Sequence, residues 1–162
     1  MTGSAYVAVS VLLAVAMLTA GCGGDDAAER DDDGRVTQAG QMDVVELRVG
    51  DCFVPPEDVE AEVTVVRAVP CDEPHEHEVY AFAPWTEGDL RPDDNQLGTF
   101  ADTACLAEFE PYVGRDYLDS PLVLTYLLPS IRSWNELGDH GVVCVARSNS
   151  ELSGSVRQGT PS

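Results

Sequence analysis

The four-residue run His75-Glu76-His77-Glu78 carries the side chains best suited to metal binding in this sequence. In an extended chain, residues two apart project to the same side, so His75 and His77 could share one cation. Imidazole and carboxylate groups are common zinc ligands, and His140 or Asp139 could supply a third if the last strand lies alongside. The alternative is structural: His75 forms a local hydrogen bond and His77 faces water. We expect this alternative, and therefore no metal and no cofactor.

Five cysteines are a second source of possible chemistry. Cys22 follows an apolar leader, and the remaining four form an even set that predicts two disulfides in an exported chain. None belongs to a C-x-x-C pair, which disfavours a thioredoxin-like redox site. Three pairings are possible. We favour Cys52–Cys71, which brackets two consecutive predicted strands, and Cys105–Cys144, which ties the predicted helix to the strand beneath it.

The sequence contains no recognisable catalytic motif. It has no nucleophile elbow, phosphate-binding loop or dinucleotide fingerprint, and lysine is absent. A Cys–His pair needs a free thiol, which the predicted disulfides do not leave. With 29 acidic and 9 basic residues and a net charge of −20, neighbouring carboxylates are expected by chance alone. We therefore expect no enzyme activity, no basic patch able to neutralise phosphates, and no nucleic-acid partner.

An apolar leader opens the chain and ends at a cysteine. Residues 5–20 are too few and too small to settle as a membrane-spanning helix, and they are typical of a secretory signal. The sequence Leu18-Thr19-Ala20-Gly21-Cys22 resembles the lipobox of bacterial lipoproteins. This resemblance implies that residues 1–21 are a signal peptide and that Cys22 carries the lipid anchor. A core helix or a plain secretory signal is the alternative, and no Lys or Arg precedes the apolar stretch.

Two polar segments flank the part of the chain expected to fold. Residues 22–43 have few large apolar side chains and many acidic ones, so we predict a disordered tether about 25 Å long in its flexible state. A calcium loop is the alternative, but the regular ligand spacing and the turn glycine are missing. Residues 148–162 form a polar tail that we expect to fray, although Leu152 and Val156 could add an edge strand.

Residues 44–147 predict one small α+β domain, an antiparallel sheet with one main helix stapled by two disulfides. Apolar residues recur at helical spacing over about 96–113, after Asp94 and Asn95 as candidate N-caps and before Gly114. Runs rich in β-branched and aromatic residues predict the strands. The expected strands are Val44–Val49, Val63–Val69, His77–Ala83, Leu122–Leu128 and Gly141–Arg147.

A series of short motifs runs along this domain in a definite order. They are Gly50-Asp51-Cys52-Phe53, Val69-Pro70-Cys71, Pro74-His75, Glu78-Val79, Cys105 with Phe109, Tyr112 and Gly114, and Trp134, Gly138-Asp139 and Cys144. Together they resemble the septum-formation domain family of lipoproteins and membrane proteins from high-GC Gram-positive bacteria. The resemblance implies an extracytoplasmic domain connected with septum or envelope biology, without an established catalytic activity.

Two classes of function remain after these exclusions. The first is a noncatalytic interaction module, anchored to the outer face of the cytoplasmic membrane through Cys22, that docks on an envelope or divisome protein or on the cell wall. The second is a lipoprotein that binds a small ligand or a metal through His75 and His77. An exposed apolar patch near Trp85 or Trp134 would favour the first class, and histidines converging in a concavity would favour the second.

Overall fold

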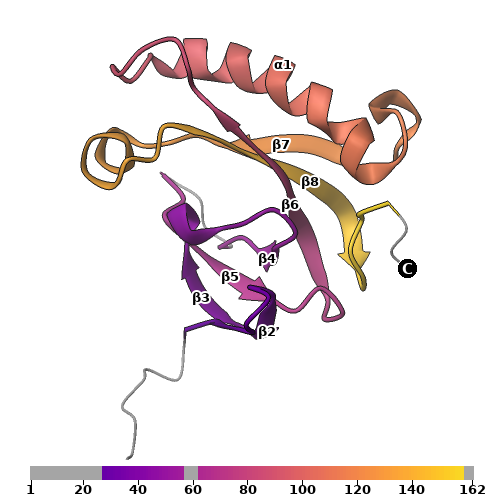
Figure 1. The fold of residues 1–162 in the computed structure, drawn as a ribbon. Helices are drawn as coiled ribbons and strands as arrows, with labels where there is room; N and C mark the ends of the chain where they lie inside the picture. The colour runs from indigo at the N-terminus through magenta and orange to yellow at the C-terminus, as the bar shows by residue number, and fades with distance from the viewer. Residues whose placement is uncertain (1–26, 57–61, 159–162) are drawn as a thin grey trace, which may run out of the picture.

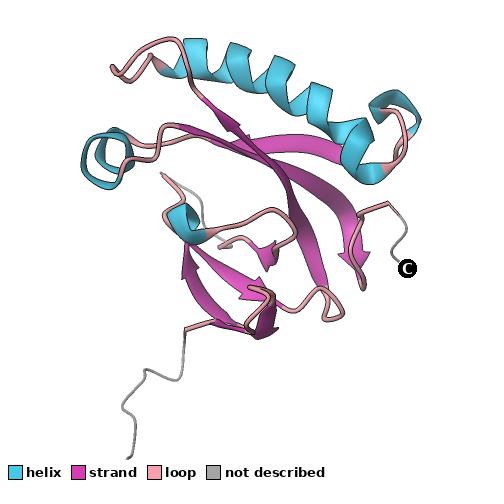
Figure 2. Cartoon of the chain, viewed as in Figure 1, coloured by secondary structure: helices cyan, strands magenta, loops and turns pink. Residues whose placement is uncertain are grey.

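The computed structural model describes residues 27–56 and 62–158. Cys22 and the predicted signal peptide lie outside the described residues. A six-stranded antiparallel sheet has the order β3-β5-β4-β6-β8-β7, and a short ribbon of β1 and β2 lies near its first edge (Figures 1 and 2). The strands are β1 Glu29–Arg30, β2 Val36–Gln38, β3 Gly40–Asp43, β4 Cys52–Val54, β5 Val65–Val69, β6 His75–Pro84, β7 Val123–Leu127 and β8 Gly141–Leu152. With one long helix and two disulfides, the predicted α+β fold is confirmed.

The helix α1, Asp94–Val113, lies across one face of the β6-β8-β7 half of the sheet (Figure 1). Its N-cap is Asp93, one residue before the candidate Asp94, because Asp93 and Gln96 form a capping box. It ends at Gly114, whose left-handed φ of 76° favours a residue without a Cβ. Its buried side chains are Leu97, Ala101, Cys105, Phe109 and Tyr112, as the periodicity predicts. They pack on β6 and β8 to form the larger apolar core.

A second apolar cluster joins the two halves of the sheet. Phe53 and Val66, from the β3-β5-β4 half, pack with Val79, Val143 and Val145 of β6 and β8. Strand β4 forms only a short ladder with β6, and the first half of the sheet turns away from the helix layer (Figure 1). The molecule therefore has a helix-covered half and a half built from short strands and turns.

The expected strand Val44–Val49 is wrong. Residues Val44–Glu46 form a single 3-10 turn, and the neighbouring strands are β3 before it and β4 after it. The apolar side chains that face the second cluster, Val44 and Leu47, are three residues apart, which is the period of a 3-10 turn. Val45 and Val49 are exposed. The expected strands at 63–69, 77–83, 122–128 and 141–147 are confirmed as β5, β6, β7 and β8.

Both flanking segments are ordered over much of their length. The predicted disordered tether is wrong for residues 27–43, because Gly40–Asp43 pair with Val65 to Ala68 of β5 and Met42 is buried. The predicted frayed tail is also wrong up to residue 158. Strand β8 continues to Leu152, and the backbone N–H of Gln158 then donates to the carbonyl of Tyr112 at 2.8 Å. Within the described ranges, no helix is both long and apolar enough to cross a bilayer.

Candidate functional site

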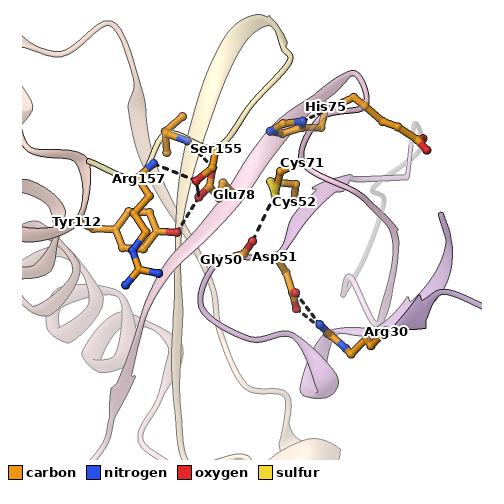
Figure 3. The surroundings of a disulfide bond; sticks show 12 residues. Arg30, Gly50, Asp51, Cys52, Cys71, His75, Glu78, Tyr112, Ser155 and Arg157 are labelled. Carbon is orange, nitrogen blue, oxygen red and sulfur yellow. Dashed lines mark hydrogen bonds and ion pairs between the residues drawn. A yellow bond between two sulfur atoms is a disulfide. The ribbon is translucent and has the colours of Figure 1, made fainter. Parts of the chain in front are cut away.

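The disulfide Cys52–Cys71 joins β4 to the turn between β5 and β6, with 5.2 Å between the Cα atoms (Figure 3). Cys52 is fully buried and Cys71 is half-buried. The Cys71 Sγ atom lies 3.4 Å from the carbonyl oxygen of Gly50, a contact without a proton because the sulfur is oxidised. The predicted pairing is confirmed for this bond and for Cys105–Cys144. Neither bond leaves a thiolate for catalysis or metal binding.

A buried ion pair lies beside this disulfide. Arg30 donates from its two terminal nitrogens to the two carboxylate oxygens of Asp51, at 2.7 and 2.6 Å. The backbone N–H of Arg48 donates to the same carboxylate at 2.7 Å. The hydrogen bond to Asp51 raises the pKa of the Arg30 guanidinium. This pair fastens the ribbon of β1 and β2 to the turn before β4.

Glu78 is a fully buried carboxylate on β6 that holds the C-terminal segment. Its Oε1 atom accepts hydrogen bonds from the hydroxyls of Tyr112, at 2.7 Å, and Ser155, at 2.6 Å, and its Oε2 atom accepts from the N–H of Val156 at 2.7 Å. Three donors replace the water that this carboxylate loses on burial. Burial and the bond to Glu78 raise the pKa of the Tyr112 hydroxyl, which therefore keeps its proton. Figure 3 shows this network next to the disulfide.

The three histidines do not converge. His75 and His77 enter β6 at the end that pairs with Leu152 and Arg147 of β8. His140 precedes β8 at the other end, where its Nε2 atom lies 3.0 Å from the carbonyl of Trp134 and its ring stacks on that indole. The proposed third ligand from His140 is therefore wrong. Asp139 lies next to His140, at the end of the sheet away from His75 and His77. There it accepts a hydrogen bond from Ser133 at 2.9 Å, and burial raises the pKa of its carboxyl group.

His75 and His77 behave differently from each other. His75 is buried, and its Nδ1 atom donates to the carbonyl of Glu73 at 2.8 Å, which agrees with the predicted local bond. His77 does not face water, because its ring stacks on Phe53 at 5.2 Å. Burial first, and then the charge of Arg147, lower the pKa of His77 to about 4. Neither Nε2 of His75 nor Nδ1 of His77 has a hydrogen-bond partner among the described residues.

The disulfide, the Asp51 ion pair and the C-terminal segment border one open groove of about 820 Å³. Three arginines line it, Arg35, Arg48 and Arg157, each exposed to solvent. No carboxylate in the described part of the chain lies within 4 Å of any of the three guanidinium groups. The groove therefore brings together three arginines on an otherwise acidic chain, together with Asp33, Asp51 and Asp72. The arginines stand at positions 35, 48 and 157, so no local motif could have revealed the cluster.

A smaller and more apolar cavity of about 280 Å³ lies at the opposite end of the β8 strand. It is bordered by Val44 and Val45 on one side and by Leu128 and Leu137 on the other. Leu137 and the nearby Ile131 are 59% and 70% exposed, on the loop that carries the buried Trp134. Leu137 and Ile131 are thus exposed apolar side chains near Trp134, where an apolar patch would favour an interaction module.

Ligand sets for a metal are scarce in this structure. Among the described residues, the one group of three possible ligands within reach of a common ion is Cys52, Cys71 and Glu78. Both sulfurs are consumed by the disulfide, and the Glu78 carboxylate is saturated with donors. The hydroxyl of Ser155 donates its proton to the same carboxylate, which also accepts from Tyr112 and Val156.

Comparison with known proteins identifies relatives of this chain. A protein-family model described as "Septum formation" matches residues 19–144. A protein of Mycobacterium bovis named "Putative lipoprotein LppN" is 33% identical over 120 residues, which cover 70% of this chain and 64% of that protein. The match therefore spans less than two thirds of the relative's length. No solved structure matches this chain significantly.

Proposed function

The chain belongs to the septum-formation family, and on that premise we propose that it is a lipoprotein with a noncatalytic binding domain that acts outside the cytoplasmic membrane, in septum formation or envelope assembly. Cys22 is the proposed anchor and residues 1–21 the proposed signal peptide. The name of the mycobacterial relative supports the lipoprotein part of the proposal. The two disulfides support an oxidising compartment.

One observation carries the proposal of a binding domain. Family-like residues from distant parts of the chain meet around Cys52–Cys71, five of them lining the groove and two, His75 and Glu78, buried beside it. They are Gly50, Asp51, Cys52, Cys71, His75, Glu78 and Tyr112. Each one serves to hold a backbone segment or a neighbouring side chain. A groove of this size, bordered by residues that hold the structure around it, supports a binding domain.

The first experiment tests the membrane anchor. In the native host, the wild-type protein should fractionate with membranes, and Cys22→Ser should move to the soluble exported fraction, because one thiol carries the whole anchor. Thr19→Ser, which keeps a small residue in the lipobox, is the matched control and should remain at the membrane. Retention of Cys22→Ser after a carbonate wash would contradict the lipoprotein proposal.

Septal action is tested by the position of a fluorescent C-terminal fusion. The wild-type fusion should concentrate at division sites, and crosslinking there should capture an envelope or divisome protein. A fusion spread evenly around the cell would contradict the septal role while leaving the anchor intact.

A second candidate, metal binding, is favoured by the bare Nε2 of His75 and Nδ1 of His77. Two imidazoles without a third ligand do not make a tight zinc site. Calorimetric titration of the purified protein with zinc should therefore give no submicromolar binding. A stoichiometric submicromolar site that is lost in His75→Gln would replace the binding-domain proposal with a metal-binding one.

A further inference from the structure

We propose that the groove beside Cys52–Cys71 binds a phosphate-bearing ligand through Arg35, Arg48 and Arg157. This inference rests on the proposed role of the domain as a binding module and names the chemistry that it recognises. On the extracytoplasmic side, phosphate groups are exposed by lipid headgroups and by soluble polyanions. Both carry the group that the arginines would contact.

The first argument is the availability of the three guanidinium groups. The chain has nine basic residues among 29 acidic ones, so an exposed arginine has many carboxylates with which to pair. Arg35, Arg48 and Arg157 nevertheless have no carboxylate within 4 Å among the described residues. Their donors remain open to a ligand in the groove that all three line.

The second argument is the charge of the groove itself. Asp33, Asp51 and Asp72 line it together with the three arginines. Asp51 is neutralised by its bidentate pair with Arg30, which leaves the exposed Asp33 and Asp72 against three free guanidinium groups. Among the lining residues, the three free guanidinium groups thus outnumber the two unpaired carboxylates, on a chain whose net charge is −20. A local excess of this kind attracts anions over about one Debye length, roughly 8 Å at physiological salt.

The third argument is that buried contacts position the segments bearing these arginines. The Arg30–Asp51 pair holds the ribbon that bears Arg35, and Asp51 also binds the backbone of Arg48. Glu78 holds the segment that bears Arg157 by hydrogen bonds to Ser155 and Val156. The disulfide lies between this network and the Arg30–Asp51 pair (Figure 3). Ordering these segments before binding lowers the entropy cost of recognition.

Two local details orient the arginine side chains. The guanidinium of Arg157 lies over the ring of Tyr112, with its carbon 5.5 Å from the ring centre, which leaves the edge of its planar group free to donate. Arg48 lies against the turn at Gly34, where a Cβ would come within 2.7 Å of its Nη1 atom. Gly34 has a φ of +83°, so both its backbone and its missing side chain make room for Arg48.

The number of arginines favours phosphate over a single carboxylate. A carboxylate satisfies one guanidinium fork with its two oxygens, whereas a phosphate offers three or four oxygens to several forks at once. The volume of about 820 Å³ accommodates a ligand larger than one phosphate, such as a phosphodiester headgroup or a short polyphosphate.

The test uses the detergent-solubilised full-length protein at physiological salt and calorimetric titration with three probes. Inorganic tripolyphosphate represents a soluble polyanion, glycerophosphoglycerol represents an anionic headgroup, and glycerol is the control without phosphate. Binding of the first, the second or both, without the third, supports the proposal and identifies the source of the phosphate. Absence of binding by both anionic probes overturns it.

The variants Arg35→Gln, Arg48→Gln and Arg157→Gln should each weaken binding about tenfold, the effect of losing one charge-assisted contact. Arg67→Gln is the matched control, because Arg67 is equally exposed and unpaired among the described residues but lies on β5 outside the groove. Equal affinities for Arg67→Gln and the groove variants would also overturn the proposal. Septal localisation of the wild-type protein without phosphate binding would refute this inference alone, whereas loss of localisation refutes the proposed function.

Discussion

The two disulfides lie in regions that are stabilised in different ways. Cys105 and Cys144 are fully buried between α1 and β8, among apolar side chains such as Leu97 and Phe109. Cys52–Cys71 lies at the edge of a groove, next to Asp51 and Glu78. The first bond reinforces an apolar core that the helix already covers. The second reinforces a set of turns whose order depends on hydrogen bonds and one ion pair.

The same type of bond therefore reinforces two regions of a small domain that are stabilised by different interactions. Apolar burial is non-directional, so the helix-covered half tolerates shifts of a few tenths of an ångström. The groove half depends on directional contacts, each of which loses its energy when its geometry is lost. The helix-covered half is therefore suited to support, and the groove half to recognition.

The largest effect should come from removing the disulfide under the helix. The double variant Cys105→Ala, Cys144→Ala opens a loop of 39 residues and should lose about 4 kcal/mol of unfolding free energy by loop entropy. Urea unfolding monitored by far-ultraviolet circular dichroism measures this loss. A folded variant should still bind the phosphate probes, because no groove residue has changed.

The second disulfide should contribute less to stability and more to the groove. The double variant Cys52→Ala, Cys71→Ala opens a loop of 19 residues and should lose about 3 kcal/mol. Hydrogen exchange should then accelerate at Gly50 and Gly154, whose N–H groups bond near this disulfide, more than at the core residue Leu97. A larger loss here than in the Cys105–Cys144 variant would reverse the comparison between the two regions.

The buried carboxylate of the groove half should come next. Glu78→Gln replaces one acceptor oxygen by a donor that faces Tyr112, Ser155 or Val156, and it should cost about 2 kcal/mol. The amide of Val156 should exchange faster with solvent. Glu108→Gln, an exposed change on α1, is the control and should leave stability within about 0.5 kcal/mol. Unchanged exchange at Val156 would contradict the anchoring role of Glu78.

The smallest effect concerns pH. Because burial lowers the pKa of His77 to about 4 from an ordinary value near 6.5, the unfolded chain binds a proton that the folded chain refuses. Stability from this group is therefore complete above about pH 6.5 and is lost as pH falls towards 4. After solvent screening, the loss should be about 1 kcal/mol. His77→Phe, which keeps the stack on Phe53, should flatten stability over this range relative to wild type, and an unchanged slope would refute the assignment.

Several elements followed from local sequence because local physics defines them. The 3.6-residue period from Leu97 to Tyr112 and the glycine after Val113 specify α1. The strand predicted at 77–83 is confirmed as β6, but its centre, Glu78 to Ala81, is buried on both faces and is not half-buried as the alternation predicted. The Cys105–Cys144 bond was predictable because it connects the recognised helix to a recognised strand, whereas Cys52 lies on β4, which was not among the expected strands. The predicted strand Val44–Val49 was wrong because β3 already pairs with β5 in the sheet, and β-branched residues are compatible with the short turn that follows β3.

The sequence alone predicted the fold class, the helix and four of the strands, because each arises from residues close in the chain, and it limited the four cysteines to three pairings, of which the structure has the favoured one. Only the tertiary structure decided the groove. Arg30 reaches Asp51 across 21 residues, and Glu78 reaches Ser155 across 77. Such pairs leave no periodicity in a chain crowded with carboxylates, because any of the many acidic residues could have been the partner until folding selected one. The arginine cluster and the ordered ends of the domain follow from those selections.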